Sequence, residues 1–203
     1  MDPIRNPFAP GAGTPPPELA GRDELRESLR ITIARAKLGR PAKSAMLVGL
    51  RGVGKTVLLD RVREDAESAG FQTIRVEAPE GRSLPSILAP QLRQALLRLS
   101  QVEAAKEVAI RGLRALAGFA KKLKVTFGDI EVGLDYEPEP GLADNGDLEH
   151  DLQALFEQVG AAAKAAETVL VIFIDELQYV EEPQMAALIT AMHRTEQRQL
   201  PVV

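Results

Sequence analysis

The residues with the clearest chemistry lie between positions 49 and 56, where glycines, a lysine and a threonine follow the pattern G-x-x-x-x-G-K-[ST]. The apolar run 44–48 before them predicts a short buried strand, and residues 56–69 have helical periodicity. Glycines allow a loop between strand and helix to turn its N–H groups around a polyphosphate. Lys55 is expected to reach the β- and γ-phosphates, and the Thr56 hydroxyl to bind Mg²⁺.

A second set of reactive groups follows the apolar residues 169–174, where Asp175 and Glu176 are adjacent carboxylates. Six β-prone apolar residues predict a central strand that is buried on both faces and ends at a polar site. Asp175 is our candidate for holding Mg²⁺ through its water shell. Glu176 points elsewhere and is our candidate for polarising the water that attacks the γ-phosphate.

The elements that must position these residues belong to a chain of 203 residues with 45% hydrophobic content, which suits one domain with an appended arm. The net charge of −4 offers no overall basic field, so it gives no support to nucleic-acid binding. No cysteine is present, which excludes disulfides and thiolate metal sites. No apolar run approaches the ~20 residues that span a bilayer, and the N-terminus has no apolar signal core. We therefore expect a cytoplasmic protein without a membrane partner.

Alternating proline and glycine near the N-terminus predict an extended arm over residues 1–18, and the remainder, 19–203, is predicted to form the domain. Hydrophobic periodicity separates the remaining segments into helices and strands. Helices are expected at 21–38, 56–69, 84–99, 102–123 and 147–166, strands at 44–48, 72–77 and 169–174, and a β-hairpin at 124–136.

At this point the chain resembles the AAA+ and signal-transduction ATPases, in particular the origin-recognition-like or archaeal-type ATPase domains. The resemblance extends over about residues 19–203. Three stretches carry it: the entry motif at 19–25, the loop at 49–56 and the strand end at 173–176. It implies a P-loop NTPase fold, an α/β three-layer α/β/α sandwich with a mainly parallel central sheet. The helix and β-hairpin at about 102–142 are then an insertion, because the interval between the two motifs is long for the family.

The resemblance also implies an assignment of site residues in the Walker A and Walker B motifs. Thr56 and Asp175 are the metal residues, Lys55 and Glu176 act in catalysis, and Gly21 with Arg22 lies near the adenine. The implied ligands are ATP and Mg²⁺. The residues expected to bind the nucleotide are Gly49, Arg51, Gly52, Val53, Gly54, Lys55, Thr56, Val57, Gly21 and Arg22.

The family's strand order places the next strand between the Asp175 strand and the P-loop strand, and here it would begin at Leu200. In the family the sensor residue, the arginine finger and the helical lid follow that point. A chain without them is expected to bind ATP and hydrolyse it weakly, because an arginine finger contributes about 10³ to 10⁵ in rate. Such a chain is also expected to be marginally stable, with Val171 and Phe173 poorly covered.

Four features have more than one interpretation. Basic residues along 102–123 suit a nucleic-acid or membrane surface, but we favour a core-facing helix with a solvated side. The acidic loop 144–147 suits calcium less well than a turn with an N-cap. Arg194 and Arg198 face either a neighbouring subunit or, as we favour, water. Gln178 and Tyr179 either respond to the γ-phosphate or pack under the next helix, and the sequence does not separate these two.

The leading functional hypothesis is Mg²⁺-dependent ATP binding and hydrolysis in a conformational switch, with an oligomer or a downstream protein as partner. One alternative is a DNA-associated ATPase of replication or transposition. Another is a nucleotide-binding module with little hydrolysis, which acts as an interaction protein. The fold alone does not choose between these outputs.

Overall fold

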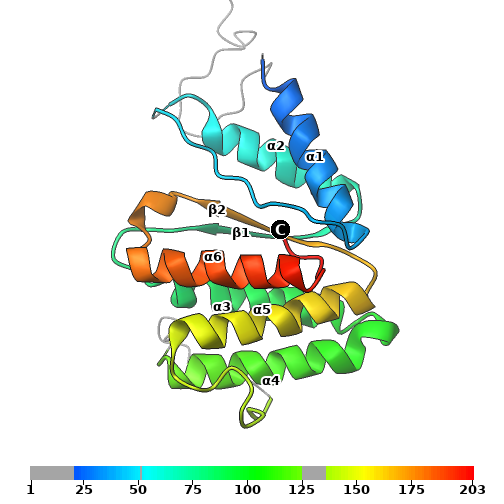
Figure 1. The fold of residues 1–203 in the computed structure, drawn as a ribbon, viewed down its shortest axis with the longest axis vertical. Helices are drawn as coiled ribbons and strands as arrows, with labels where there is room; N and C mark the ends of the chain where they lie inside the picture. The colour runs from blue at the N-terminus through cyan, green and yellow to red at the C-terminus, as the bar shows by residue number, and fades with distance from the viewer. Residues whose placement is uncertain (1–20, 51, 125–135) are drawn as a thin grey trace, which may run out of the picture.

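The computed structural model describes residues 21–50, 52–124 and 136–203 as helices packed on both faces of a small parallel sheet (Figure 1). Strands β1 (Gln72–Glu77) and β2 (Leu170–Asp175) pair in parallel, from Gln72 opposite Leu170 to Glu77 opposite Asp175. Helices α1 (Asp23–Lys37) and α2 (Lys55–Ser68) cover one face. The other face is covered by α3 (Leu84–Leu99), α5 (Leu148–Ala165) and α6 (Glu182–Gln197). The predicted α/β class with helices around a parallel sheet is confirmed.

Alternation along the two strands assigns their side chains to the two faces of the sheet. In β2, Leu170, Ile172 and Ile174 belong to the core between the sheet and helices α3, α5 and α6. The alternate residues Val171 and Phe173 pack with α1 and α2, so Asp175, two residues on, lies on the α2 face. The strand therefore delivers its terminal carboxylate to the side of the sheet on which α2 begins.

Beyond α3 and α5 lies a further helix, α4 (Lys106–Lys122), which follows the short 3-10 turn Glu103–Ala105 (Figure 1). Most of one side of α4 is buried, and Gly112 lies so close to Leu96 that an added Cβ would be 2.7 Å from its Cδ2. This agrees with the core-facing interpretation of the basic helix. The predicted β-hairpin at 124–136 lies almost wholly outside the described residues, and its assignment as an insertion stays a prediction.

The residues after α6 pair with β2 on the edge that does not face β1. Leu170 donates its N–H to the carbonyl of Pro201 at 2.9 Å, and Ile172 donates to the carbonyl of Val203 at 2.8 Å. Leu170 and Val202 form a parallel bridge. The segment therefore neighbours β2 as the family's strand order implied, but its other expected neighbour, a strand at 44–48, is not formed.

The prediction of a strand at 44–48 is wrong for this structure. The segment has no assigned strand, and Met46 and Val48 are 58% and 87% exposed. The physical reason lies in its neighbours: among the described residues, no backbone hydrogen bond joins this segment to residues 201–203 or to another strand, so its N–H and C=O groups have no ladder. An apolar run predicts a tendency to be buried but does not provide the pairing partner.

The expectation that Val171 and Phe173 are poorly covered is also wrong. These side chains are only 4% and 6% exposed, in a cluster with Ile33 of α1 and with Leu58 and Val62 of α2. The two helices above the sheet supply the contacts that we expected from a neighbouring strand. Side-chain burial on the face of a strand therefore does not require that its edge be paired.

Candidate functional site

The glycine-rich loop, hereafter the P-loop (residues 49–56), passes into α2 through backbone conformations that suit glycine. Gly52 has φ of 81° and Gly54 has φ of 82°, both in the left-handed region that other residues rarely adopt. Gly54 is also the N-cap of α2, and no side chain caps the first N–H groups of that helix. The helix N-terminus therefore leaves backbone donors and a partial positive charge available to an anion.

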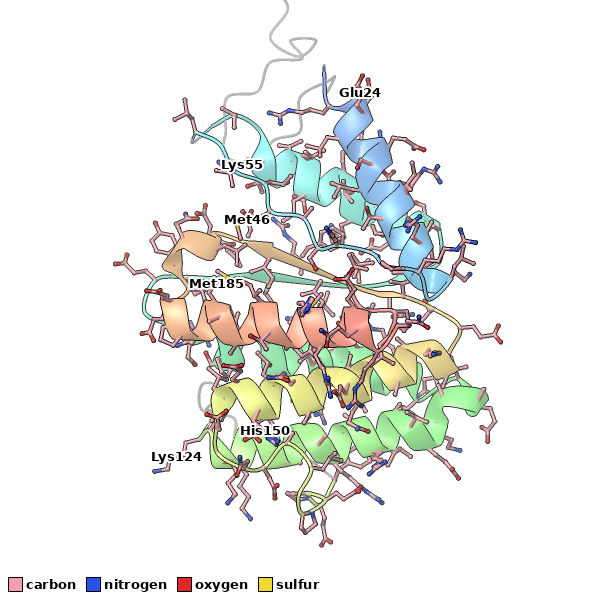
Figure 2. All side chains as sticks on the ribbon, in the orientation of Figure 1. Glu24, Met46, Lys55, Lys124, His150 and Met185 are labelled. Carbon is pink, nitrogen blue, oxygen red and sulfur yellow. The ribbon has the colours of Figure 1, made fainter. Side chains whose placement is uncertain are left out.

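Lys55 and Arg22 bring positive charge to this loop from the N-terminal ends of two helices. The Lys55 ammonium donates to the carbonyls of Gly49 and Leu50, at 2.8 Å in each case. Arg22, immediately before α1, donates through Nη2 to the carbonyl of Val53 at 2.9 Å. Figure 2 shows Lys55 at the start of α2, above the incoming segment that carries Met46. The arginine of the entry motif is therefore in direct contact with the loop.

The P-loop and the end of β2 meet through Thr56 and Asp175. The Thr56 hydroxyl donates to Oδ2 of Asp175 at 2.8 Å, and the Asp175 side chain is 17% exposed. A hydroxyl and a carboxylate are hard oxygen ligands, which fit Mg²⁺. Among the described residues no group of three or more acidic, histidine or cysteine side chains is gathered to hold a metal. The donor set therefore suits an ion that takes most of its remaining ligands from water and a phosphate.

Glu176 follows in a left-handed conformation, with φ of 57°, at the end of β2. Its N–H donates to Oδ1 of Asp175 at 3.0 Å, and its carboxylate accepts a hydrogen bond from the Gln178 amide. Gln178 lies on the 3-10 turn Leu177–Tyr179. The two interpretations considered for Gln178 did not include this contact with the neighbouring carboxylate.

Two charged residues near Asp175, Arg75 and Asp60, were not among the residues predicted from the sequence. Arg75 of β1 contacts Asp60 of α2 at 2.9 Å, and its other terminal nitrogen is 3.9 Å from Oδ2 of Asp175. The sequence did contain one clue. Side chains alternate along a strand, so Arg75, two residues before Glu77, lies on the same face of the sheet as Glu77 and its partner Asp175. That clue needed the strand register, which the sequence does not state.

Helix α1 is held on α2 by an ion pair that bears on the position of Arg22. Arg26 donates to both carboxylate oxygens of Asp65, at 2.5 and 2.6 Å. This hydrogen bonding lowers the pKa of Asp65 below its usual range, and it raises the pKa of Arg26. The pair fixes the first turns of α1 against the helix that the P-loop begins.

The other candidate features have structural explanations within the chain. Arg194 and Arg198 contact Glu157 of α5 at 3.2 and 2.7 Å, so an intramolecular partner accounts for both arginines. Asp147 is the N-cap of α5 and accepts from the His150 N–H at 2.8 Å, as the preferred turn interpretation predicts. A cavity of about 420 Å³ lies beside His150, on the far side of the sheet from Lys55 (Figure 2).

A loop that caps a helix with glycine, a lysine and threonine at the helix start, and an acidic strand end beside them define a P-loop nucleotide-binding domain. A family model described as "AAA ATPase domain" matches residues 18–203. The chain belongs to this family, whose members bind and hydrolyse ATP. A search of curated proteins found no match, and neither did a search of solved structures. Within the part of the chain that the structure describes, no helix is long and apolar enough to cross a membrane.

Proposed function

We propose that this chain binds ATP together with Mg²⁺ where the P-loop meets the end of β2, and that hydrolysis there drives a conformational switch. The observation that carries the proposal is the 2.8 Å hydrogen bond between Thr56 and Asp175, which joins the two motifs at one edge of the sheet. Parallel α/β folds bind their ligands at the carboxyl ends of the strands. The family assignment supports ATP as the nucleotide.

The phosphates are assigned to the P-loop and the start of α2. Phosphate oxygens accept from the backbone N–H groups there and replace the carbonyls of Gly49 and Leu50 as partners of the Lys55 ammonium. Because Arg22 already contacts the loop at Val53, Gly21 and Arg22 are assigned to the nucleotide as well, on its adenine side.

Thr56 and Asp175 are assigned to the metal. Bound there, Mg²⁺ would supply positive charge that offsets the negative charge of the polyphosphate. Thr56 offers its hydroxyl oxygen, and Asp175 holds the water shell. Glu176 accepts a proton from the water that attacks the γ-phosphorus, and the oxygen that bridges the β- and γ-phosphorus atoms leaves with ADP.

The backbone at Glu176 supports its separate role. The left-handed conformation turns the residue away from the line of β2, and the Gln178 amide contacts its carboxylate. A base must approach the attacking water without displacing the metal from its neighbour, so adjacent carboxylates with different orientations suit this division of work.

The proposal is tested by titrating the chain with a fluorescent ATP analogue, with and without Mg²⁺. The wild type is expected to bind, and added Mg²⁺ is expected to tighten binding. The matched variants are Lys55→Ala, which removes the phosphate-binding ammonium, and Arg61→Gln, which removes a positive charge from the exposed side of α2 where Arg61 pairs with Glu64. Loss of binding in the first variant alone supports the site. Equal binding in all three proteins would contradict it.

A further inference from the structure

Arg75 lies next to the proposed metal site although it belongs to neither motif. In the parallel register Arg75 is opposite Phe173, two residues before Asp175. A long side chain reaches such a diagonal neighbour on the same face of a sheet. Nη2 of Arg75 is 3.9 Å from Oδ2 of Asp175, the oxygen that also accepts from Thr56. A permanent positive charge therefore lies beside the carboxylate oxygen assigned to the metal.

Asp60 forms an ion pair with the same guanidinium. Nη1 of Arg75 is 2.9 Å from Oδ1 of Asp60, and Asp60 lies one helical turn after Thr56 on the same face of α2. The side chains of Arg75 and Asp60 are 37% and 30% exposed, and that of Asp175 is 17% exposed. Charges that are partly withdrawn from water in this way are screened less than fully exposed ones.

The charged residues around Asp175 affect how strongly a cation binds there. Glu77, at the end of β1, is directly opposite Asp175 in the register, so two carboxylates end neighbouring strands. Arg75 offsets part of the charge of Asp175. A free divalent cation at Asp175 would find the Thr56 hydroxyl and one close carboxylate, but also the guanidinium that contacts the same carboxylate. A cation that arrives with a polyphosphate brings further oxygen ligands and compensating negative charge.

We propose that Arg75 is a positioning residue that lowers the affinity of the Asp175 site for a free divalent cation, so that the metal enters together with the polyphosphate. The inference rests on the proposed function, since it concerns the same metal site. Arg75 acts through Asp175 and does not contact the phosphates.

The direct test measures binding of Mn²⁺ alone to the nucleotide-free chain by electron paramagnetic resonance. Arg75→Gln is expected to bind Mn²⁺ about three- to tenfold more tightly than the wild type, because a repelling charge near the ion is removed. Arg75→Lys, which keeps the charge, should remain within about twofold of the wild type on the same argument. Asp175→Asn in the Arg75→Gln background should abolish the gain.

Two controls separate this effect from simpler ones. Arg61→Gln changes the net charge equally and lies on α2 in an ion pair with Glu64, so its Mn²⁺ affinity should not change. The affinity of Arg75→Gln for ATP without metal should also not change, because the arginine is not a phosphate ligand. If Arg75→Gln fails to fold, Arg75→Met replaces it and keeps the apolar stem of the side chain.

The outcomes distinguish this inference from the proposed function. Unchanged or weaker Mn²⁺ binding in Arg75→Gln, an equal gain in Arg61→Gln, or a loss of metal-free ATP binding would each overturn the role of Arg75. If the Arg75 results contradict this role but Mg²⁺ still tightens ATP binding to the wild type, the proposed function stands. If the wild type binds Mn²⁺ neither alone nor with ATP, both proposals fall.

Discussion

Thr56 and Asp175 are separated by 119 residues in the chain, and a hydrogen bond of 2.8 Å joins their side chains. One residue begins α2 and the other ends β2. The bond places the hydroxyl of the P-loop and the carboxylate of the second motif at the same edge of the sheet. The proposals on ATP and Mg²⁺ depend on this contact.

Lys55→Ala is expected to weaken ATP binding about 10- to 100-fold, because a charge-assisted hydrogen bond contributes about 1.5–3 kcal/mol. The change also removes the donor that contacts the carbonyls of Gly49 and Leu50. Isothermal titration with ATP measures the loss, and thermal unfolding checks that the fold is kept. A folded variant with wild-type affinity would exclude Lys55 from the phosphate site.

Glu176→Gln is expected to retain ATP binding and to lower the rate of hydrolysis about 10²- to 10⁴-fold, since an amide cannot accept the proton of the attacking water. Gln178→Ala removes the hydrogen-bond partner of the same carboxylate and should change turnover less than Glu176→Gln does. Phosphate release under saturating ATP measures both. Equal turnover in Glu176→Gln and the wild type would rule out the base.

Asp175→Asn is expected to remove most of the tightening of ATP binding by Mg²⁺, while binding without metal stays near the wild-type value. The amide keeps an oxygen that accepts from Thr56 but loses the negative charge that attracts the ion. The measurement is the ratio of ATP affinities with and without Mg²⁺. A ratio that does not change would show that the metal is held elsewhere.

The Arg26–Asp65 pair predicts a specific pH dependence of stability. Hydrogen bonding to Arg26 lowers the pKa of Asp65 in the folded chain, with smaller favourable contributions from Arg61 and Arg30. The pair therefore stabilises the fold fully above the ordinary aspartate pKa of about 3.9. This contribution is lost as the pH falls below that value and through the lowered pKa.

Asp65→Asn should reduce the free energy of unfolding at pH 7 by roughly 0.5–1 kcal/mol, as expected for a partly exposed pair. The difference between the variant and the wild type should shrink below pH 4, as the wild-type carboxyl becomes protonated first in the unfolded chain and, at lower pH, in the folded chain. Urea unfolding at pH 7 and pH 3 measures it. A difference that is the same at both pH values would show that the charge of Asp65 contributes nothing.

Gly160→Ala is expected to destabilise the chain although alanine favours helix. A Cβ at Gly160 would lie 2.8 Å from Cβ of Leu200 and 3.2 Å from Cγ2 of Val202, so α5 and the segment beside β2 would have to separate. Overpacking of this kind costs about 1–3 kcal/mol, more than the gain of up to about 1 kcal/mol in helix propensity.

The close contact with Leu200 can be tested by a double-mutant cycle. If the added methyl group acts through Leu200, Gly160→Ala combined with Leu200→Ala should be less destabilised than the sum of the two single changes. Urea unfolding of the four proteins measures this. Strict additivity would place the strain elsewhere.

Hydrophobic periodicity was enough to predict several helices and one strand. The strand 72–77 and the helix 84–99 have the predicted bounds. Helix α5 begins and ends within one residue of its predicted bounds, 147 and 166. The P-loop was predictable because its chemistry requires glycine at particular spacings. The strand at 44–48 was not, since an apolar segment becomes a strand only when a neighbour supplies hydrogen bonds, and among the described residues none does so for this segment.

By itself, the sequence determined which side chains are the candidates for the chemistry, because Lys55, Thr56, Asp175 and Glu176 occupy positions in two local motifs. Only the tertiary structure decided which groups surround them. Arg75 reaches Asp175 because of the register between β1 and β2, and Asp60 pairs with Arg75 because α2 lies on that face of the sheet. Motifs are read along the chain, whereas the electrostatics of a site depends on distances between residues that the chain brings together from far apart.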